Sequence, residues 1–266
     1  MKNVFILVLF VFGFFSLQAQ ELSDKQWSLV SKKTADWCPP CGGYAWDFYH
    51  DLIDDQQNEP TLLWALNYSG GLMTPTAKAM SDNFPQNSQP RFFLNNDDMN
   101  VLAGNTVEKL AEFKQVLESL SLFPPFASVG SIATFDGVKI DVTSKAKFIV
   151  DLEGGDYWLA SYLVQDELIS SQAGQGNNAK HVNVLLHTFT EGAYFGENIS
   201  SGSVDANAEF VVESGLDFTG QSTILDYSNG FKVATILWSV VDGKYTPFNI
   251  NVQSVDGISA TSNVFS

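Results

Sequence analysis

Two spacings of hydrophobic residues divide the chain into two regions. Between residues 26 and 122 the pattern switches repeatedly between the alternation typical of a strand and the longer period typical of a helix. One segment, residues 61–68, is a continuous apolar run of the kind that is buried on both faces of a sheet. The predicted elements are strand 26–32, helix 38–55, strand 61–68, helix 74–83, strand 91–94, a short strand 101–103 and helix 105–120. This order predicts an α/β layer fold whose first strand–helix turn is at residue 38.

In the second region the hydrophobic spacing is mostly two, and no long helical pattern interrupts it. Strands are predicted at residues 129–135, 138–142, 146–152, 158–164, 181–188, 208–212, 232–241 and 248–252. Gly, Asn and Asp clusters separate them, and Asp136–Gly137 is a hairpin signal. We therefore expect an all-β, antiparallel, immunoglobulin-like sandwich. Pro124–Pro125 interrupts the pattern, so the predicted domains are residues 21–124 and 125–266.

The first twenty residues have the layout of a secretory signal peptide. Lys2 is followed by an almost unbroken apolar run over residues 4–17, and Ala19 provides a small residue for cleavage. The run is shorter than the roughly 20 apolar residues that span a bilayer, which argues against a membrane anchor. A lipid anchor is not expected because no Cys lies near the cleavage point. Residues 1–20 therefore predict an exported protein.

The formal net charge of −16 at pH 7 narrows the choice of partners. Such an acidic surface repels nucleic acid and anionic lipid, so neither is an expected partner. Apolar residues are plentiful and no long low-complexity tract is present, which is typical of a globular chain.

The two cysteines of the chain, Cys38 and Cys41, lie at the predicted start of the first helix. A disulfide-stapled secreted scaffold would carry four or more, so general stapling is not their expected role. At a helix start the two Cα atoms lie close enough for a disulfide, and the free N–H groups favour the Cys38 thiolate. Pro39 and Pro40 fit the backbone of an opening helical turn. We expect Cys38 to attack a disulfide and Cys41 to resolve the mixed disulfide.

Two other interpretations of the cysteine pair remain open. Together with His181 and His187 the cysteines make a two-Cys, two-His set for zinc. Both histidines lie on one predicted strand, however, where their spacing spans about 20 Å, so no metal site is expected. The second alternative is an inert structural disulfide in an oxidising compartment, although so small a loop contributes little stability.

The motif Trp37–Cys38–Pro39–Pro40–Cys41, Pro90 and the element order make residues 26–122 resemble a thioredoxin-fold domain. The Cys-Pro-Pro-Cys form is similar to that of envelope thiol:disulfide reductases. The resemblance implies that Pro90 follows a cis peptide bond, faces the cysteines and shapes the substrate groove. It also implies that Trp37 shields the site.

The whole chain resembles the 28-kilodalton outer-membrane-protein-related family. The resemblance lies in residues 34–38 and in residues 164–196, which include Gln172 and His181. It implies a Gram-negative-type envelope location, in the periplasm or at the outer membrane, and a thioredoxin-like first half. It implies little about substrate.

Lys32 departs from the thioredoxin pattern, which has a buried acid six residues before the first cysteine. A charged Lys32 would favour the Cys38 thiolate but would accept a proton poorly. We expect it instead to point into solvent from the end of the strand. Gly42–Gly43 is also unusual, because glycine weakens a helix by roughly 1 kcal/mol relative to alanine.

Two functional hypotheses follow. The preferred one is an enzyme that performs thiol:disulfide exchange on exported proteins, with protein thiols or disulfides as partners and without a cofactor. The alternative is a non-catalytic binding or structural protein, peripherally associated with the outer membrane, that uses the thioredoxin fold as a scaffold. If Cys38 is buried beneath the second domain, exchange with a protein substrate requires domain motion.

Overall fold

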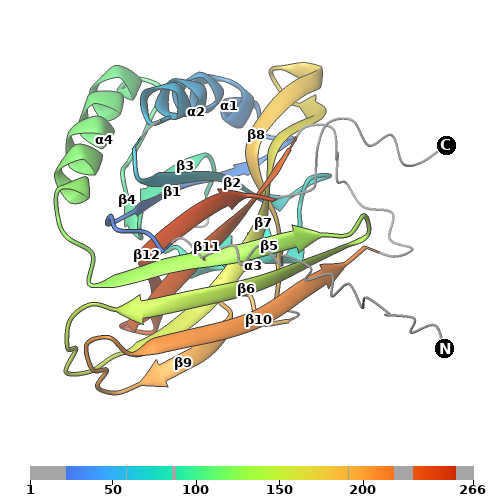
Figure 1. The fold of residues 1–266 in the computed structure, drawn as a ribbon. Coiled ribbons are helices and arrows are strands. Elements are labelled where there is room, and N and C mark those ends of the chain that lie inside the picture. Colours follow the sequence, from blue (N-terminus) through green and yellow to red (C-terminus); the bar gives the residue numbers. More distant parts are fainter. Residues whose placement is uncertain (1–21, 58, 86–87, 191, 219–229, 256–266) are drawn as a thin grey trace, which may run out of the picture.

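The structure is a computed structural model that describes residues 22–57, 59–85, 88–190, 192–218 and 230–255. The predicted signal peptide, residues 1–20, lies outside the described residues. Within these ranges no helix has both the length and the apolar character needed to cross a bilayer. The described residues form a mixed α/β fold with large sheets and few helices (Figure 1).

The first region alternates strands with helices in the predicted order βαβαββα. Its elements are β1 (Ser28–Ala35), α1 (Pro39–Gly42), α2 (Tyr44–Asp55), β2 (Thr61–Ser69), α3 (Pro75–Asn83), β3 (Arg91–Leu94), β4 (Asp97–Asp98) and α4 (Thr106–Ser121). β1 is central: it pairs in parallel with β2 on one side and antiparallel with β3 on the other, and β3 pairs with β4. The Cys motif follows β1 directly, so the motif begins at the end of a strand that is buried along its whole length.

Two local predictions for this region are wrong. The expected single helix over residues 38–55 is divided at Gly43, whose backbone (φ −94°, ψ −122°) is not helical. The expected strand at residues 101–103 is a loop. The partner of β3 is instead β4, because Asn95 adopts φ 53° and closes a tight hairpin.

The described residues of the second region form eight strands. They are β5 (Ala127–Phe135), β6 (Lys139–Phe148), β7 (Asp156–Gln172), β8 (Gly176–Thr188), β9 (Glu197–Ser201), β10 (Glu209–Asp217), β11 (Phe231–Val241) and β12 (Lys244–Ser254). β7 and β8 form a hairpin that is much longer than the predicted strands 158–164 and 181–188. Polar side chains break the alternation in its outer half, where Gln165 and Gln172 are nevertheless buried. The sequence pattern therefore missed the outer half of the hairpin.

Strands from both regions belong to one nine-stranded sheet. Its order is β12-β11-β7-β8-β2-β1-β3-β4, with β9 paired to β7. The junction is the parallel contact of β2 with β8, where Ala65 is opposite Val184. The predicted boundary at Pro124–Pro125 lies between α4 and β5, so it separates layers of the fold without separating the sheet.

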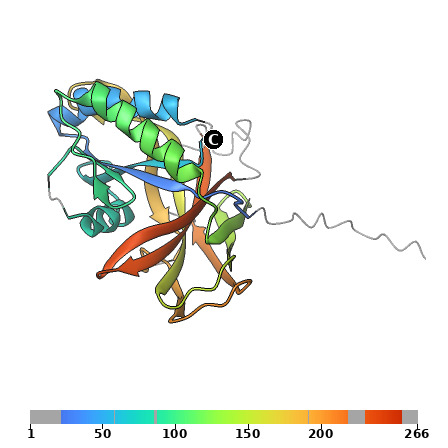
Figure 2. The same cartoon turned by 90° about the vertical axis from the view of Figure 1, so that its left-hand side faces the viewer.

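A second sheet of three strands, in the order β10-β6-β5, packs on the large sheet. Buried residues such as Ile140 and Phe148 of β6 belong to the same apolar clusters as Leu163 of β7 and Leu237 of β11. The two sheets pack face to face as in a sandwich, but the larger one also contains strands of the first region, which the expected all-β second domain does not include. In Figures 1 and 2 the three-stranded sheet and the helices α2 and α4 lie at opposite ends of the molecule.

The sheet of the first region separates two apolar clusters. On one face Val30 and Phe92 pack with Phe48 of α2 and Phe113 of α4. On the other face Trp64 packs with residues of α3, β7 and β11. Burial on both faces holds the end of β1, and with it the Cys motif, at a fixed place between the two layers.

Candidate functional site

The Cys38–Cys41 pair forms a disulfide in the structure, with the two Cα atoms 5.2 Å apart. Cys38 is the residue before α1, and the Cys41 backbone N–H donates to its Sγ at 3.3 Å. Both cysteines are buried, with exposures of 3% for Cys38 and 0% for Cys41. The motif is therefore in its disulfide form, and both cysteine residues are largely shielded from solvent.

Trp37, Pro39 and Pro40 surround the buried cysteines with exposed apolar surface. The Trp37 side chain is 54% exposed, and its Nε1 donates to the Ser69 hydroxyl at 3.1 Å. Asp36 accepts a hydrogen bond from the Gly71 backbone N–H at 2.7 Å. These two contacts attach the motif to the end of β2 and to the loop after it, and they leave the indole ring on the surface beside the motif.

Tyr68 links the cysteines to the loop that precedes β3. Its ring packs on the small cluster of Ala35, Cys38 and Cys41. Its hydroxyl donates to the side-chain oxygen of Gln89 at 2.5 Å. The Gln89–Pro90 peptide bond is cis, as the sequence resemblance implied, and Pro90 is buried. The structure therefore connects Pro90 to the Cys pair through Tyr68 and Gln89, two residues that the sequence pattern did not single out.

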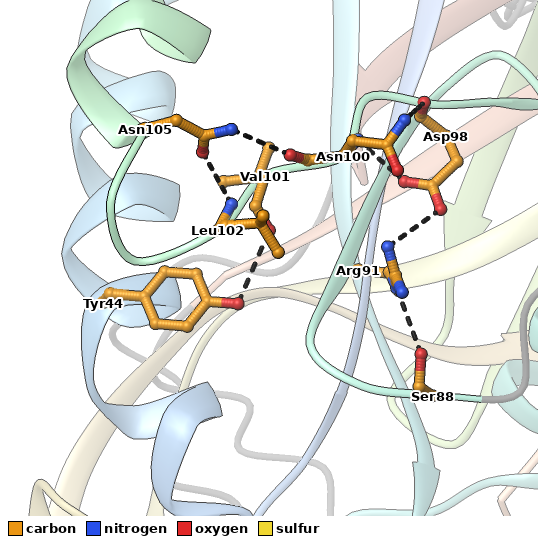
Figure 3. A network of polar contacts seen from close by, with 8 residues as sticks. All are labelled: Tyr44, Ser88, Arg91, Asp98, Asn100, Val101, Leu102 and Asn105. Atoms are coloured by element: carbon orange, nitrogen blue, oxygen red, sulfur yellow. Dashed lines mark hydrogen bonds and ion pairs between the residues drawn. The ribbon is translucent and has the colours of Figure 1, made fainter.

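A polar network holds the segment after Pro90 in place (Figure 3). Arg91 donates to the Ser88 hydroxyl at 3.1 Å and forms an ion pair with Asp98 at 3.2 Å. Asp98 also accepts from the Asn100 backbone N–H at 2.9 Å. Asn105 closes the following loop through hydrogen bonds to the backbones of Asn100 and Leu102, as Figure 3 shows.

The tip of the β7–β8 hairpin binds the backbone of the Cys motif from the second region (Figure 1). The Ala173 N–H donates to the Asp36 carbonyl at 2.7 Å. The Gln172 amide donates to the carbonyls of Ala35 at 3.3 Å and Cys38 at 3.2 Å. The Gln175 amide donates to the Gly42 carbonyl at 2.7 Å. Sequence reasoning missed this contact, although the unexplained glycine after Cys41 was a signal of it.

Gly42 is where the hairpin tip comes closest to the motif. A Cβ atom placed on Gly42 would lie 1.9 Å from the Ala173 carbonyl oxygen, a separation that real atoms do not adopt. Only glycine fits this position without moving the hairpin. The two glycines are thus explained separately. Gly42 leaves room for the hairpin tip, and Gly43 lies where the helix is divided.

The expectation that Lys32 points into solvent is wrong. Its exposure is 3%, and its Nζ lies 4.8 Å from the ring centroid of Tyr49 and 5.2 Å from that of Trp46. Burial lowers the pKa of Lys32 to about 7, and the charge of Asp47 offsets part of this shift. The reason is position: Lys32 is in the interior of β1, and its side chain lies under α2, where the aromatic faces accept a cation.

His181 of β8 packs edge-on against Trp46, with ring centroids 5.2 Å apart. Burial lowers the pKa of His181 to about 4; a backbone hydrogen bond with Ser171 opposes the shift, and the charge of Lys32 adds to it. Within the described part of the chain its Nε2 has no hydrogen-bond partner. His187 lies further along β8, beside Phe218. In the described ranges no three His, Cys, Asp or Glu side chains are arranged to hold a metal ion.

The chain is similar to known proteins in structure and not in sequence. No protein-family model matches the sequence, and no curated protein matches it. HBP35 of Porphyromonas gingivalis is similar in structure, with a TM-score of 0.71 and 16% identity over 92% of this chain and 80% of that chain. A domain of the outer membrane lipoprotein Omp28 from Porphyromonas gingivalis has a TM-score of 0.31 and 13% identity over 49% of this chain and 88% of that domain. The likeness to HBP35 establishes that this chain has the HBP35 fold.

Proposed function

We propose that the protein performs thiol:disulfide exchange on exported proteins of the cell envelope, through a thioredoxin-like first region. The observation that carries the proposal is the Cys38–Cys41 disulfide, which follows β1 and lies beside Tyr68, itself hydrogen-bonded to the residue before cis-Pro90. The strand order β2-β1-β3-β4, with β1 and β2 parallel, supports the thioredoxin-like assignment. Residues 1–20 support export.

The chemistry needs only the two cysteines. In the reducing direction the Cys38 thiolate attacks one sulfur of a substrate disulfide, and the other substrate sulfur leaves as a thiolate that takes a proton from solvent. The Cys41 thiolate then attacks Cys38 Sγ, which releases the first substrate sulfur and forms the disulfide seen in the structure. Two electrons pass from the cysteine pair to the substrate. The reverse sequence oxidises a substrate dithiol.

The neighbours of the cysteines have supporting roles in this proposal. Exposed Trp37, Pro39 and Pro40 offer an apolar surface to a substrate chain, and Pro90 shapes the groove. Lys32 takes the sequence position of the buried acid, and burial lowers its pKa to about 7, so that a fraction of the amine is neutral near pH 7.

The first test is the reduction potential of the Cys38–Cys41 pair in the mature protein, measured by equilibration with glutathione buffers and alkylation of the thiols. We expect a value between about −120 and −270 mV, the range of thiol-exchange proteins. In addition, Cys41→Ser should accumulate a mixed disulfide through Cys38 when it is incubated with oxidised insulin. A potential well below about −300 mV with no alkylation of Cys38 would mark a structural disulfide and refute the proposal.

The second candidate function is a non-catalytic binding or structural protein of the envelope. The observation that favours it is the 3% exposure of Cys38, together with the hairpin tip that is bound to the motif. In that case the disulfide fixes the surface around Trp37, and Cys38→Ser/Cys41→Ser should retain every interaction of the wild-type protein. Loss of reduction or oxidation of insulin in that variant would contradict the second candidate, provided that the wild-type protein has the activity.

A further inference from the structure

We propose that the tip of the β7–β8 hairpin is a clamp on the Cys38–Cys41 motif, with Gln172 as the positioning residue. The clamp favours the disulfide over the dithiol and must loosen before Cys38 exchanges with a protein substrate. This inference rests on the proposed thiol:disulfide exchange, and it gives the second region of the chain a role in that reaction.

The hydrogen bonds between tip and motif all run in one direction. The tip supplies the donors: the Ala173 N–H and the amides of Gln172 and Gln175. The motif supplies the acceptors, which are the backbone carbonyls of Ala35, Asp36, Cys38 and Gly42. These carbonyls lie before, between and after the two cysteines, so the tip holds the whole turn that the disulfide closes.

Gln172 is built into this position. Its side chain is buried, and one amide nitrogen reaches the carbonyls of Ala35 and Cys38. The tip itself is a tight turn in which the Gln175 N–H donates to the Gln172 carbonyl at 2.9 Å, and Gly174 adopts φ 94°. The turn therefore presents both glutamine side chains to the motif from a fixed backbone.

The backbones of tip and motif are packed as closely as glycine permits. Gly42 has no room for a Cβ beside the Ala173 carbonyl. On the other side, a Cβ on Gly174 would lie 3.2 Å from the Gly42 carbonyl oxygen and 3.5 Å from that of Pro39. Because both sides of the contact carry glycine, the contact depends on close backbone packing as well as on hydrogen bonds.

Such a contact favours the state whose geometry it fits. Reduction breaks the S–S bond, and the two sulfurs then separate from bonding distance to van der Waals contact, which shifts the turn between them. The carbonyls that Gln172 and Gln175 bind belong to this turn, so the bonds fit the disulfide form best and bias the equilibrium toward it. The same bonds hold Cys38 in its buried position, from which attack on a protein disulfide is blocked.

Two variants loosen the clamp in different ways. Gly42→Ala adds a methyl group that must displace Ala173, while alanine is favoured over glycine in the helical turn that contains it. Gln172→Ala removes the amide and leaves the backbone unchanged. The controls are Gly104→Ala, where a Cβ meets no atom within 4 Å, and Gln115→Ala, an exposed position of α4.

The measurement is the equilibrium of each variant with dithiothreitol, together with the rate at which iodoacetamide alkylates Cys38 in the reduced protein. We expect Gly42→Ala to shift the equilibrium about tenfold toward the dithiol, which corresponds to about 30 mV for two electrons. For Gln172→Ala we expect a shift of about three- to tenfold, the effect of one or two hydrogen bonds. Alkylation should accelerate in both variants, and both controls should match the wild-type protein.

Unchanged equilibrium and alkylation in both clamp variants would overturn the inference. If Gly42→Ala does not fold, Gln172→Ala and Gln175→Ala decide the result by the same two readouts. Insulin reduction in the same set of proteins separates this inference from the proposed function. If the clamp variants change the dithiothreitol equilibrium but no protein in the set, including the wild type, reduces insulin, the exchange function is refuted and the clamp is not. If all variants reduce insulin equally and keep the wild-type reduction potential, the clamp is refuted and the exchange function is not.

Discussion

The β7–β8 and β11–β12 hairpins both turn at a glycine with positive φ but end in different surroundings. At the β11–β12 tip, Asp242 and Gly243 adopt φ values of 51° and 72°, and a Cβ on Gly243 would meet no atom within 4 Å. At the β7–β8 tip, Gly174 has a similar φ of 94° but lies against the backbone of the Cys motif. A turn of this kind forms without any distant contact. The β7–β8 turn therefore does not need the contact with the Cys motif in order to form, and for this reason we assign the contact a functional role.

The two hairpins also differ in the side chains that pack against them. β8 rests on α2, where His181 packs on Trp46 above buried Lys32. β12 is held by neutral groups: the Asn83 side chain binds both the N–H and the carbonyl of Tyr245, whose ring stacks on Phe195. Two buried titratable side chains, Lys32 and His181, thus lie under the hairpin that reaches the cysteines, while an amide and an aromatic ring hold Tyr245 of β12. The predictions below test this difference, beginning with the largest effect.

Lys32→Met should stabilise the protein at pH 7 by about 2–4 kcal/mol, because it removes the free-energy penalty of a buried cation. The folded-state pKa of Lys32, about 7, lies below its unfolded value of 10.5, so the unfolded state binds more protons between these pH values. Wild-type stability should therefore rise as the pH increases from 7 to 10.5, and the variant should lack this part of the rise. Urea unfolding at several pH values measures it. Parallel curves for the two proteins would contradict the assignment.

His181→Phe should remove a loss of stability that the wild-type protein shows in acid. The pKa of folded His181, about 4, lies below the ordinary value of 6.5, so stability is complete above pH 6.5 and falls as the pH drops toward 4. We expect the variant to reduce this fall by about 1–3 kcal/mol while keeping a ring against Trp46. Hydrogen exchange at pH 5 should show the change in β7 and β8 and not in β11 and β12. Equal exchange in both hairpins would argue against a local effect.

Asn83→Ala should destabilise the protein by about 1–2 kcal/mol, since two hydrogen bonds to Tyr245 are lost. The loss should be the same from pH 5 to pH 8, because no titratable side chain takes part in these bonds. The reduction potential of the cysteines should stay at the wild-type value. Thermal unfolding and dithiothreitol equilibration check both points, and a changed potential would show that the β11–β12 hairpin also acts on the motif.

Gly174→Ala and Gly243→Ala form the closest matched pair. Each places a side chain at positive φ, and each should destabilise the protein by about 1 kcal/mol. Only Gly174→Ala should also accelerate Cys38 alkylation, because the new methyl group presses on the Gly42 carbonyl. If both variants accelerate alkylation, or neither does, the two tips do not differ as we propose.

Local sequence patterns predicted a large part of the fold. Continuous apolar runs such as residues 61–68 and the helical spacing before residue 120 are properties of single elements, and they gave the order of the first region. The Cys-Pro-Pro-Cys spacing predicted the disulfide, and resemblance predicted the cis bond at Pro90. Alternation predicted β5 and β11. It was wrong in dividing β6 into two strands, 138–142 and 146–152, and it missed β9 and joined no strand to the first region.

The sequence by itself thus determined which residues form the disulfide, because a disulfide between neighbouring cysteines depends only on a short stretch of chain. The tertiary structure alone decided their surroundings. It buried Lys32 between β1 and α2, and it brought Gln172 to the backbone of Cys38 across more than a hundred residues of sequence. Both outcomes depend on the packing of elements distant in sequence, which hydrophobic periodicity does not encode. The one local trace of that packing is Gly42, whose missing side chain makes room for the hairpin.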